Sequence, residues 1–521
     1  MSTPDIKTDI LVIGSGLAGC AAAWAAAKVG ASVVMVTRAG GPEESNTFWA
    51  QGGIIYEGKN DSPGKLVQDI LTAGAGLSSP EAAWLLSREG PHLVKEILIE
   101  ELGVKFDRAS QDSAEWHLTA EAAHSLPRIL HCKDQTGSAI ERVFLERVAS
   151  HPNVTVKRKA TAVDLLTVSH HSEEPLDVYR PLTCVGAYVL DQASGQINPL
   201  LARETILATG GLGRVYLHTT NPPGAAGDGN AMASRAGARC INMQYVQFHP
   251  TTLYHPSGRF LITEAVRGEG GRLVDGKGRE FMSRFHPDGS LAPRDITARA
   301  IYQVMLESGE PCAYLDISHK PAAEVRERFP GIYAHCLALG IDITQQPIPV
   351  VPAAHYSCGG IAVDEWGQTN LARLRAVGEV SCTGLHGANR LASTSLLECL
   401  VWGTRAGAHA ASSAAKGGHY FPRIVPWRYE REAVDPALIA QDWLTIQQTM
   451  WNYVGLIRSE KRLNRAYEIL RELNVEISRF YEKAEVTDAI IGLRNGIQTA
   501  RLLLLAAKES RESRGCHYRI D

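Results

Sequence analysis

A glycine-rich turn near the start of the chain has the spacing of a site for nucleotide phosphates. The run Ile10-Leu11-Val12-Ile13 is short, apolar and rich in branched residues, which is typical of a buried parallel strand. Gly14-Ser15-Gly16-Leu17-Ala18-Gly19 follows directly, and an alanine-rich helical pattern continues from there. In this context Gly14 permits a tight turn, Gly16 lets the backbone approach a pyrophosphate, and Gly19 lets the helix pack closely. The motif therefore predicts a bound dinucleotide at the N-terminus of the helix, whose free N–H groups favour phosphate.

The second predicted strand, residues 32–36, ends without the acidic residue that usually binds a ribose. Thr37 and Arg38 stand there instead. The Thr37 hydroxyl can bond to a ribose hydroxyl, and the Arg38 guanidinium suits a phosphate or an adenine edge. The motif by itself is compatible with FAD or with NAD(P).

Further segments have the pattern of nucleotide-domain parts. One apolar strand runs into a pair of glycines, one turn opens a helix with an aspartate, and one strand ends in a carboxylate that suits a ribose hydroxyl. Another helix begins near residue 395, and its positive N-terminal end could face a flavin ring. These segments supply the candidate cofactor contacts Thr209, Gly210, Asp228, Glu379, Ser395 and Leu396.

The order of these segments predicts an α/β fold with an insertion. A Rossmann-like dinucleotide-binding domain is expected from residues 1–236 and 355–420. Residues 237–354, which are rich in Arg, His, Gly and Pro, are expected to form an inserted α+β capping domain. Amphipathic helical patterns then predict a C-terminal bundle of three helices within residues 421–521, with a tail from Gly515.

The composition fits a large globular chain and excludes several classes of protein. The chain has 521 residues, of which 45% are hydrophobic and 21% charged, so it is neither disordered nor a small disulfide scaffold. A net charge of −3 provides no general basic field for nucleic acid. The ten cysteines form no C-x-x-C pair, so we predict no metal site and a reducing, cytoplasmic compartment. Residues 10–27 are uncharged but rich in Gly and Ala, and we expect a strand and a helix there rather than a membrane span.

Several motifs occur in an order that resembles the flavoproteins of succinate dehydrogenase and fumarate reductase. Besides the glycine fingerprint, these motifs are Ser45-Asn46-Thr47-Phe48-Trp49-Ala50-Gln51-Gly52-Gly53, Gln247-Phe248-His249-Pro250-Thr251, Thr263-Glu264-Ala265-Val266-Arg267-Gly268, Pro293-Arg294-Asp295 and His355-Tyr356-Ser357-Cys358-Gly359-Gly360. Within this superfamily the chain is most similar to the L-aspartate oxidases, on residues 118–125 (LTAEAAHS) and 387–399 (GANRLASTSLLEC). The resemblance covers nearly the whole chain.

The resemblance implies an activity and its cofactor. FAD would accept a hydride at N5 from the α-carbon of L-aspartate, which leaves as iminoaspartate. O2 (giving H2O2) or fumarate (giving succinate) would be the electron acceptor. This reaction would be the first step of bacterial NAD synthesis, with hand-over of the product to quinolinate synthase as one option. Asn46 stands where the respiratory enzymes carry the histidine that binds FAD covalently, so non-covalent FAD is implied, with contacts along the whole segment from Ser45 to Gly53.

The resemblance also implies a set of substrate residues. A dicarboxylate needs fixed donors, which the forks of Arg390 and Arg294 would provide. Further donors to the substrate carboxylates would be the ring N–H groups of His249 and His355 and the hydroxyl of Thr263. Glu121 would face the ammonium group, and Glu264 with Arg267 would form a proton path beside Arg294.

The sequence leaves alternatives at several of these positions. Arg267 could be only an ion-pair partner, Asp228 only a helix cap, and Glu121 only a solvated loop charge. The family's basic residue and two glycines around this glutamate are replaced by Ala120, Ala122 and Ala123. The alternative activities are a fumarate reductase or succinate dehydrogenase flavoprotein, and a flavin-binding protein without catalysis.

Overall fold

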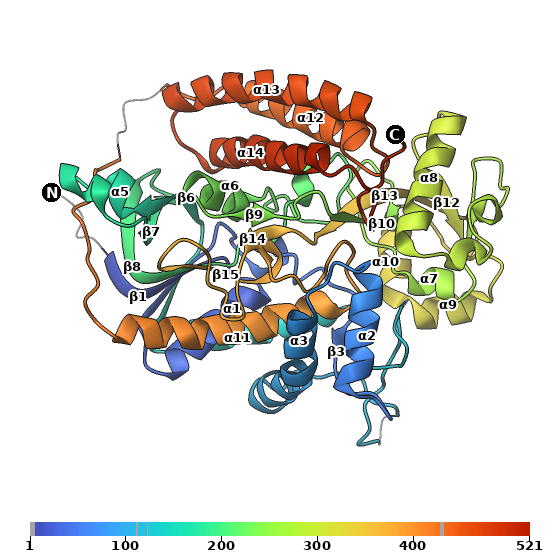
Figure 1. Ribbon diagram of the computed structural model, residues 1–521. Coiled ribbons are helices and arrows are strands. Elements are labelled where there is room, and N and C mark those ends of the chain that lie inside the picture. Colours follow the sequence, from blue (N-terminus) through green and yellow to red (C-terminus); the bar gives the residue numbers. More distant parts are fainter. Residues whose placement is uncertain (1–5, 111–112, 122, 428–431) are drawn as a thin grey trace.

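A seven-stranded sheet forms the centre of the first domain in this computed structural model, which describes residues 6–110, 113–121, 123–427 and 432–521 (Figure 1). In spatial order its strands are β5 (Val154–Lys157), β2 (Val33–Val36), β1 (Ile6–Ile13), β8 (Ile197–Leu207), β7 (Cys184–Asp191) and β6 (Ala160–Thr167), and β15 (Leu374–Ala376) also pairs with β8. The strands β5, β2, β1, β8 and β15 are parallel, whereas β7 and β6 are antiparallel to their neighbours. The predicted α/β fold is confirmed.

The glycine turn joins β1 to α1 (Leu17–Lys28), as the sequence predicts. Gly14 has a φ of 117°, and a Cβ there would lie 2.1 Å from the carbonyl oxygen of Ala208. A Cβ on Gly19 would lie 2.1 Å from the carbonyl oxygen of Gly14. Both positions therefore require glycine, because the helix begins in direct contact with the carboxyl ends of β1 and β8.

Helix α1 packs along α11 (Thr394–Ala415) on one side of the sheet (Figure 1). Gly407 permits the contact, since a Cβ there would lie 2.1 Å from the carbonyl oxygen of Ala22. Gly403 likewise lies against Ala18, so the two helices run parallel and the start of α11 extends beyond the N-terminus of α1. The other helices of this domain are α2 (Pro63–Ala73), α3 (Pro80–Leu93) with a π-helical continuation (Val94–Glu101), α4 (Thr136–Ala149), α5 (Val168–His171) and α6 (Asp228–Arg235). Two small sheets complete it: the pair β3 (Ile54–Ile55) and β4 (Ile129–Leu130), and the three strands β9 (Cys240–Ile241), β14 (Gly360–Ala362) and β16 (Ser381–Cys382).

A four-stranded antiparallel sheet carries the inserted domain, with the order β10-β13-β12-β11. Its strands are β10 (Val246–Leu253), β13 (Ile348–Ser357), β12 (Ala313–Asp316) and β11 (Arg272–Val274), and its helices are α7 (Ala265–Gly268), α8 (Arg294–Ser308), α9 (Ala322–Arg328) and α10 (Pro330–Ala338). Strand β13 crosses the predicted boundary at residues 354–355, so residues 355–357 still belong to the capping sheet by hydrogen bonding. The domain limits themselves stay a prediction.

Three helices follow near the end of the chain: α12 (Pro436–Tyr453), α13 (Glu460–Lys483) and α14 (Asp488–Glu509). They lie on the side of the sheet opposite α11, and α14 packs on α6 (Figure 1). The predicted bundle is confirmed, and Asp435 caps α12 by accepting the amide of Ala437. The predicted tail is wrong, because Cys516 and His517 are buried. Within the described residues no helix is long and apolar enough to cross a bilayer.

Candidate active site

A cavity of about 640 Å³ lies where the first domain meets the capping domain. Nearly all of the predicted cofactor and substrate residues line it, from the glycine turn at Gly14 to Arg294 and Arg390. The exceptions among the predicted residues are Gly19, Phe48 and Arg267. Gly19 packs against the glycine turn, and Arg267 lies behind Glu264, which lines the cavity. One site thus combines residues from segments that are far apart in the sequence.

The cofactor half of the cavity has the donors and acceptors that FAD needs. Helix α1 begins after Gly16, which has no side chain of its own to cap the first turn, and Thr47 Oγ1 accepts the N–H of Leu17 at 3.1 Å. Asn46 Oδ1, Gln51 Oε1 and Thr209 Oγ1 are buried cavity-lining atoms that have no hydrogen-bond partner in the described part of the chain. Such orphaned acceptors are costly unless a ligand satisfies them. The residues present therefore fit a bound dinucleotide.

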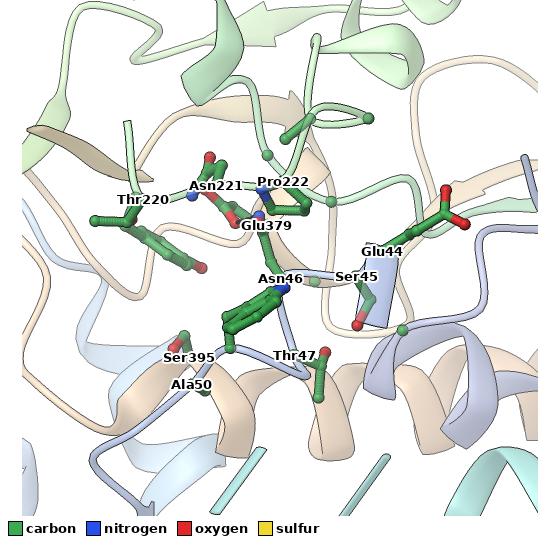
Figure 2. Close-up of a pocket in the computed structure, with 18 of the residues that line it drawn as sticks. Glu44, Ser45, Asn46, Thr47, Ala50, Thr220, Asn221, Pro222, Glu379 and Ser395 are labelled. Carbon is green, nitrogen blue, oxygen red and sulfur yellow. Dashed lines mark hydrogen bonds between the residues drawn. The ribbon is translucent and has the colours of Figure 1, made fainter. Parts of the chain in front are cut away.

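Asn46 and Glu379 lie next to each other on the wall of this half of the cavity, with Thr47 and Ser395 nearby (Figure 2). Asn46 Nδ2 donates to Glu379 Oε2 at 3.0 Å, and the backbone N–H of Ser357 donates to Glu379 Oε1 at 3.0 Å. Burial raises the pKa of Glu379 to about 7. The predicted ribose ligand thus lies in the cavity, where it is oriented by the residue that replaces the covalent-linkage histidine.

Arg38 and Asp228, both predicted cofactor contacts, are paired with each other. Arg38 Nη1 lies 2.7 Å from Asp228 Oδ2, and Arg38 Nη2 lies 2.8 Å from Asp488 Oδ1 at the start of α14. Burial opposes ionisation of Arg38, but the two carboxylates more than compensate and raise its pKa. Both residues still line the cavity. Their charges also tie the C-terminal helices to the cofactor half, a contact that the sequence pattern did not predict.

Arg390 is buried in the substrate half, and its guanidinium forms no ion pair within the part of the chain that the structure describes. Its side chain lies over the Tyr356 ring at 4.6 Å, Nη1 donates to Ser395 Oγ at 3.1 Å, and Nη2 donates to Gln247 Oε1 at 3.2 Å. Nε has no partner, and no carboxylate lies within ion-pair distance among the residues that the structure describes. Burial and the charge of Arg294 lower the pKa of Arg390. An unpaired buried guanidinium is costly, so this position is suited to an incoming carboxylate.

Arg294 begins helix α8 and leads into a row of charged groups. Its Nε lies 2.5 Å from Glu264 Oε2, and Glu264 Oε1 lies 3.2 Å from Arg267 Nη2. Arg267 is only 1% exposed, and its Nη1 donates to the carbonyl oxygen of Ser290 at 2.7 Å. Burial raises the pKa of Glu264, but the two arginines outweigh it, and the pKa is lowered overall. Arg294, Glu264 and Arg267 thus form a continuous row of ion pairs, and the proton path along it stays a prediction.

His249 and His355 lie side by side, with ring centroids 5.5 Å apart. Burial lowers the pKa of both rings, and neighbouring arginines lower it further, so both are neutral at physiological pH. His355 Nδ1 lies 2.8 Å from Thr220 Oγ1, and a hydroxyl donor there leaves Nε2–H free for a ligand. His249 Nδ1 contacts the backbone of Thr251. Together with Thr263, which also lines the cavity, they provide neutral polar groups beside the arginines.

Glu121 lies in the cavity rather than on a solvated loop. Its Oε2 accepts a hydrogen bond from Ser393 Oγ at 2.7 Å, and Oε1 lies so close to Gly52 that a Cβ there would be 2.5 Å away. The charge of Glu121 acts on both Arg294 and Arg390. The substrate half therefore combines two cationic forks with two carboxylates, of which Glu264 is paired with arginines, while Glu121 forms no ion pair within the described residues and suits the ammonium group of an amino dicarboxylate.

The loop around Glu121 carries strain where the family's glycine is replaced. Ala123 has a φ of 67°, in the left-handed region that favours glycine, and Ala122 lies outside the described residues. We expect Ala123→Gly to stabilise the protein by about 1 kcal/mol, because the left-handed cost for a residue with a Cβ is removed. Urea denaturation measures the free energy of unfolding. Ala120→Gly, at a neighbouring position without a positive φ, is the control and should be slightly destabilising; a stabilisation of equal size there would contradict the argument.

Some site residues escaped prediction although a signal for them exists. Gln247, Tyr356 and Ser393 stand inside the recognised motifs, and each contacts Arg390 or Glu121. Glu141 supports the cofactor segment from behind, with Oε2 accepting from Ser45 Oγ at 2.5 Å. Its position one turn from Phe144 and Gly137 places it on the buried face of α4, which the helical spacing could have revealed.

Glu141 makes stability depend on pH. Burial raises its pKa to about 8, although hydrogen bonds from Ser45 and Thr47 lower it. The folded chain thus keeps a proton that the unfolded chain releases near pH 4.3, so this residue's contribution to stability falls as pH rises from about 4.5 to 8. Glu141→Gln does not titrate, so relative to the parent it should gain about 3 kcal/mol in free energy of unfolding between pH 5 and pH 8.

Urea denaturation at the two pH values tests this expectation for Glu141. Glu146→Gln, an exposed position on the same helix, is the matched control and should show no such gain. A variant at Glu141 whose stability follows the parent at both pH values would show that the carboxyl group is ionised in the folded state.

Comparisons with known proteins identify the chain as a flavoprotein. The family model for an FAD binding domain matches residues 9–396, and the model for the fumarate reductase flavoprotein C-terminal region matches residues 443–521. L-aspartate oxidase 1 of Ralstonia nicotianae is 44% identical over 517 residues, which cover 98% of this chain and 95% of that protein. The L-aspartate oxidase of Pseudomonas aeruginosa is 44% identical over 523 residues, with the same coverage.

Among solved structures, the flavoprotein FrdA of E. coli quinol fumarate reductase superposes with a TM-score of 0.87 at 26% identity, covering 100% of this chain and 92% of that chain. The fold is thus shared with that fumarate reductase flavoprotein, and the two oxidases are each 44% identical to this chain. The chain belongs to the L-aspartate oxidase family, within the flavoproteins of succinate dehydrogenase and fumarate reductase.

Proposed function

We propose that this chain oxidises L-aspartate to iminoaspartate with FAD as its cofactor. One observation carries the proposal: the buried Arg390 guanidinium, without a carboxylate partner in the described chain, shares a cavity with the Glu121 carboxylate. A guanidinium suits a carboxylate, and a carboxylate suits an ammonium group. The pair therefore matches an amino dicarboxylate better than a plain dicarboxylate.

The chain's own residues bind and orient the substrate. Arg390 and Arg294 hold its two carboxylates, and the neutral rings of His249 and His355 supply further hydrogen bonds. Glu121 receives the ammonium group. FAD, held non-covalently because Asn46 replaces the histidine, supplies the two-electron acceptor for the α-carbon hydrogen.

Arg294 also has a role when fumarate is the acceptor. Burial opposes its charge, but Glu264 and Glu121 raise its pKa, so Arg294 stays protonated. It can give up a proton only if a neighbour restores the charge at once. Glu264 at 2.5 Å from Arg294, with Arg267 beyond it, would carry out that relay, and the two salt bridges also hold the three side chains together.

The remainder of the proposal rests on family membership. O2 would be reduced to H2O2, or fumarate to succinate. The reaction would open NAD synthesis in the cytoplasm, and iminoaspartate would be delivered to a quinolinate synthase. No contact with nucleic acid or membrane is part of the proposal.

Anaerobic titration of the FAD-loaded protein tests the substrate. L-aspartate should bleach the flavin absorbance in a one-to-one ratio, and succinate should bind without bleaching it. Bleaching by succinate alone would place the chain with the succinate dehydrogenase and fumarate reductase flavoproteins in activity as well as in fold. Bleaching by neither would contradict the proposal.

A further inference from the structure

Residues 513–521 pack against the loop that carries Arg390. The backbone N–H of Cys516 donates to the carbonyl oxygen of Ala388 at 2.9 Å. Gly515 has a φ of 51°, and a Cβ there would lie 2.4 Å from that same oxygen. The segment therefore lies directly against the backbone two residues before Arg390.

A row of hydrogen bonds continues from this segment to the guanidinium. Cys516 Sγ lies 3.2 Å from Asn389 Oδ1, which also accepts from Gln247 Nε2 at 2.7 Å. Gln247 Nε2 donates to the carbonyl oxygen of Arg390 at 2.9 Å, and Gln247 Oε1 accepts from Arg390 Nη2 at 3.2 Å. Gln247 is 2% exposed, Arg390 7% and Cys516 9%. The row is thus shielded from water, where such contacts count most.

The same segment also holds the strand that carries Gln247. Arg458, which is fully buried, pairs through its backbone with Tyr518 and Ile520 at 3.0 and 3.1 Å. Its Nη1 donates to the carbonyl oxygen of Gln244 at 2.8 Å and to His517 Nδ1 at 2.6 Å. Gln244 is three residues before Gln247. Residues 513–521 therefore contact the loop of Arg390 directly and the strand of Gln247 through Arg458.

We propose that residues 513–521 are a positioning element for substrate binding, in which Cys516 acts through Asn389 and Gln247 to hold the Arg390 guanidinium in place. An arginine side chain loses considerable rotamer entropy when it is ordered. A support that orders it before the ligand arrives removes that cost from binding. The inference rests on the proposed function for the identity of the substrate, but not for the contact itself.

Calorimetric titration of the FAD-loaded protein with succinate measures this positioning without any turnover. Gln247→Leu should weaken succinate binding by about tenfold, because the guanidinium loses a neutral acceptor. Cys516→Ala should weaken it by about threefold, and Cys516→Ser, which keeps a donor to Asn389, should bind as the parent does. FAD content should stay unchanged in all three variants, and the unfolding temperature should stay unchanged in the two Cys516 variants.

Two comparisons separate positioning from a general loss of structure. Cys184→Ala removes another buried thiol, far from Arg390 on β7, and should leave succinate binding unchanged. Adding Cys516→Ala to Gln247→Leu should produce no further loss, since both act along one row. Equal weakening by Cys184→Ala and Cys516→Ala, or a full threefold loss added to Gln247→Leu, would overturn the inference. A parent protein that binds succinate but is not reduced by L-aspartate would contradict the proposed function alone.

Discussion

Arg294→Lys is expected to keep its FAD and to lose at least about a hundredfold in turnover with both L-aspartate and fumarate. The arginine places one edge against Glu264 at 2.5 Å while its remaining N–H groups stay available to the cavity. A lysine ammonium is a point charge on a flexible stem and cannot fill both positions at once. The positive charge is kept in this variant, so any loss of turnover would come from the missing planar guanidinium or from the interrupted proton relay.

Steady-state assays with each substrate, together with the flavin spectrum of the purified protein, provide the measurement. Arg284→Lys is a matched control in the same domain, where the arginine forms an exposed ion pair with Glu307 at 3.0 Å. That variant should keep turnover within about twofold, because exposed pairs contribute little. Near-parental turnover of Arg294→Lys would remove this residue from the mechanism.

The first domain was predictable because its signals are local. Gly14 and Gly19 must be glycines for contacts made within the strand, the turn and the helix, and the fingerprint records those contacts directly. Residues 10–13 of β1, all of β2 (Val33–Val36) and the end of β8 at 205–207 are buried and pair in parallel, and their continuous apolar runs show in the sequence. The helices of the last hundred residues likewise show their amphipathic period and an N-cap at Asp435.

Long-range pairings were not predictable, because no local pattern records them. Arg38 reads as a free cation in the sequence, yet its partner Asp488 lies 450 residues further along the chain. The end of the chain has the composition of a tail, and only the fold shows Cys516 against the Arg390 loop. Recognition of the family supplied most substrate residues, and the structure then added the side chains that support them.

Glu121→Gln should separate the two half-reactions. The kcat/KM for oxidation of L-aspartate is expected to fall by about a hundredfold, because the substrate ammonium group loses the Glu121 carboxylate as its counter-charge. Loss of one partner of a buried charge pair costs roughly 2–5 kcal/mol. Reduction of fumarate, which has no ammonium group, should stay within about threefold. The glutamine can still accept the hydrogen bond from Ser393 Oγ, so the side chain keeps its place in the cavity.

The affinity of Glu121→Gln for succinate should rise, a direction of change that simple damage to the site cannot produce. A carboxylate near Arg294 and Arg390 competes with an incoming dicarboxylate for the same cations, so its neutralisation should strengthen succinate binding while it weakens L-aspartate. Glu115→Gln, an exposed position in the same stretch of chain, should change neither affinity. Equal losses with L-aspartate, fumarate and succinate would mean that Glu121 only supports the loop, and the preference for an amino dicarboxylate would need another residue. Opposite signs for the two ligands would instead assign the discrimination to this one charge.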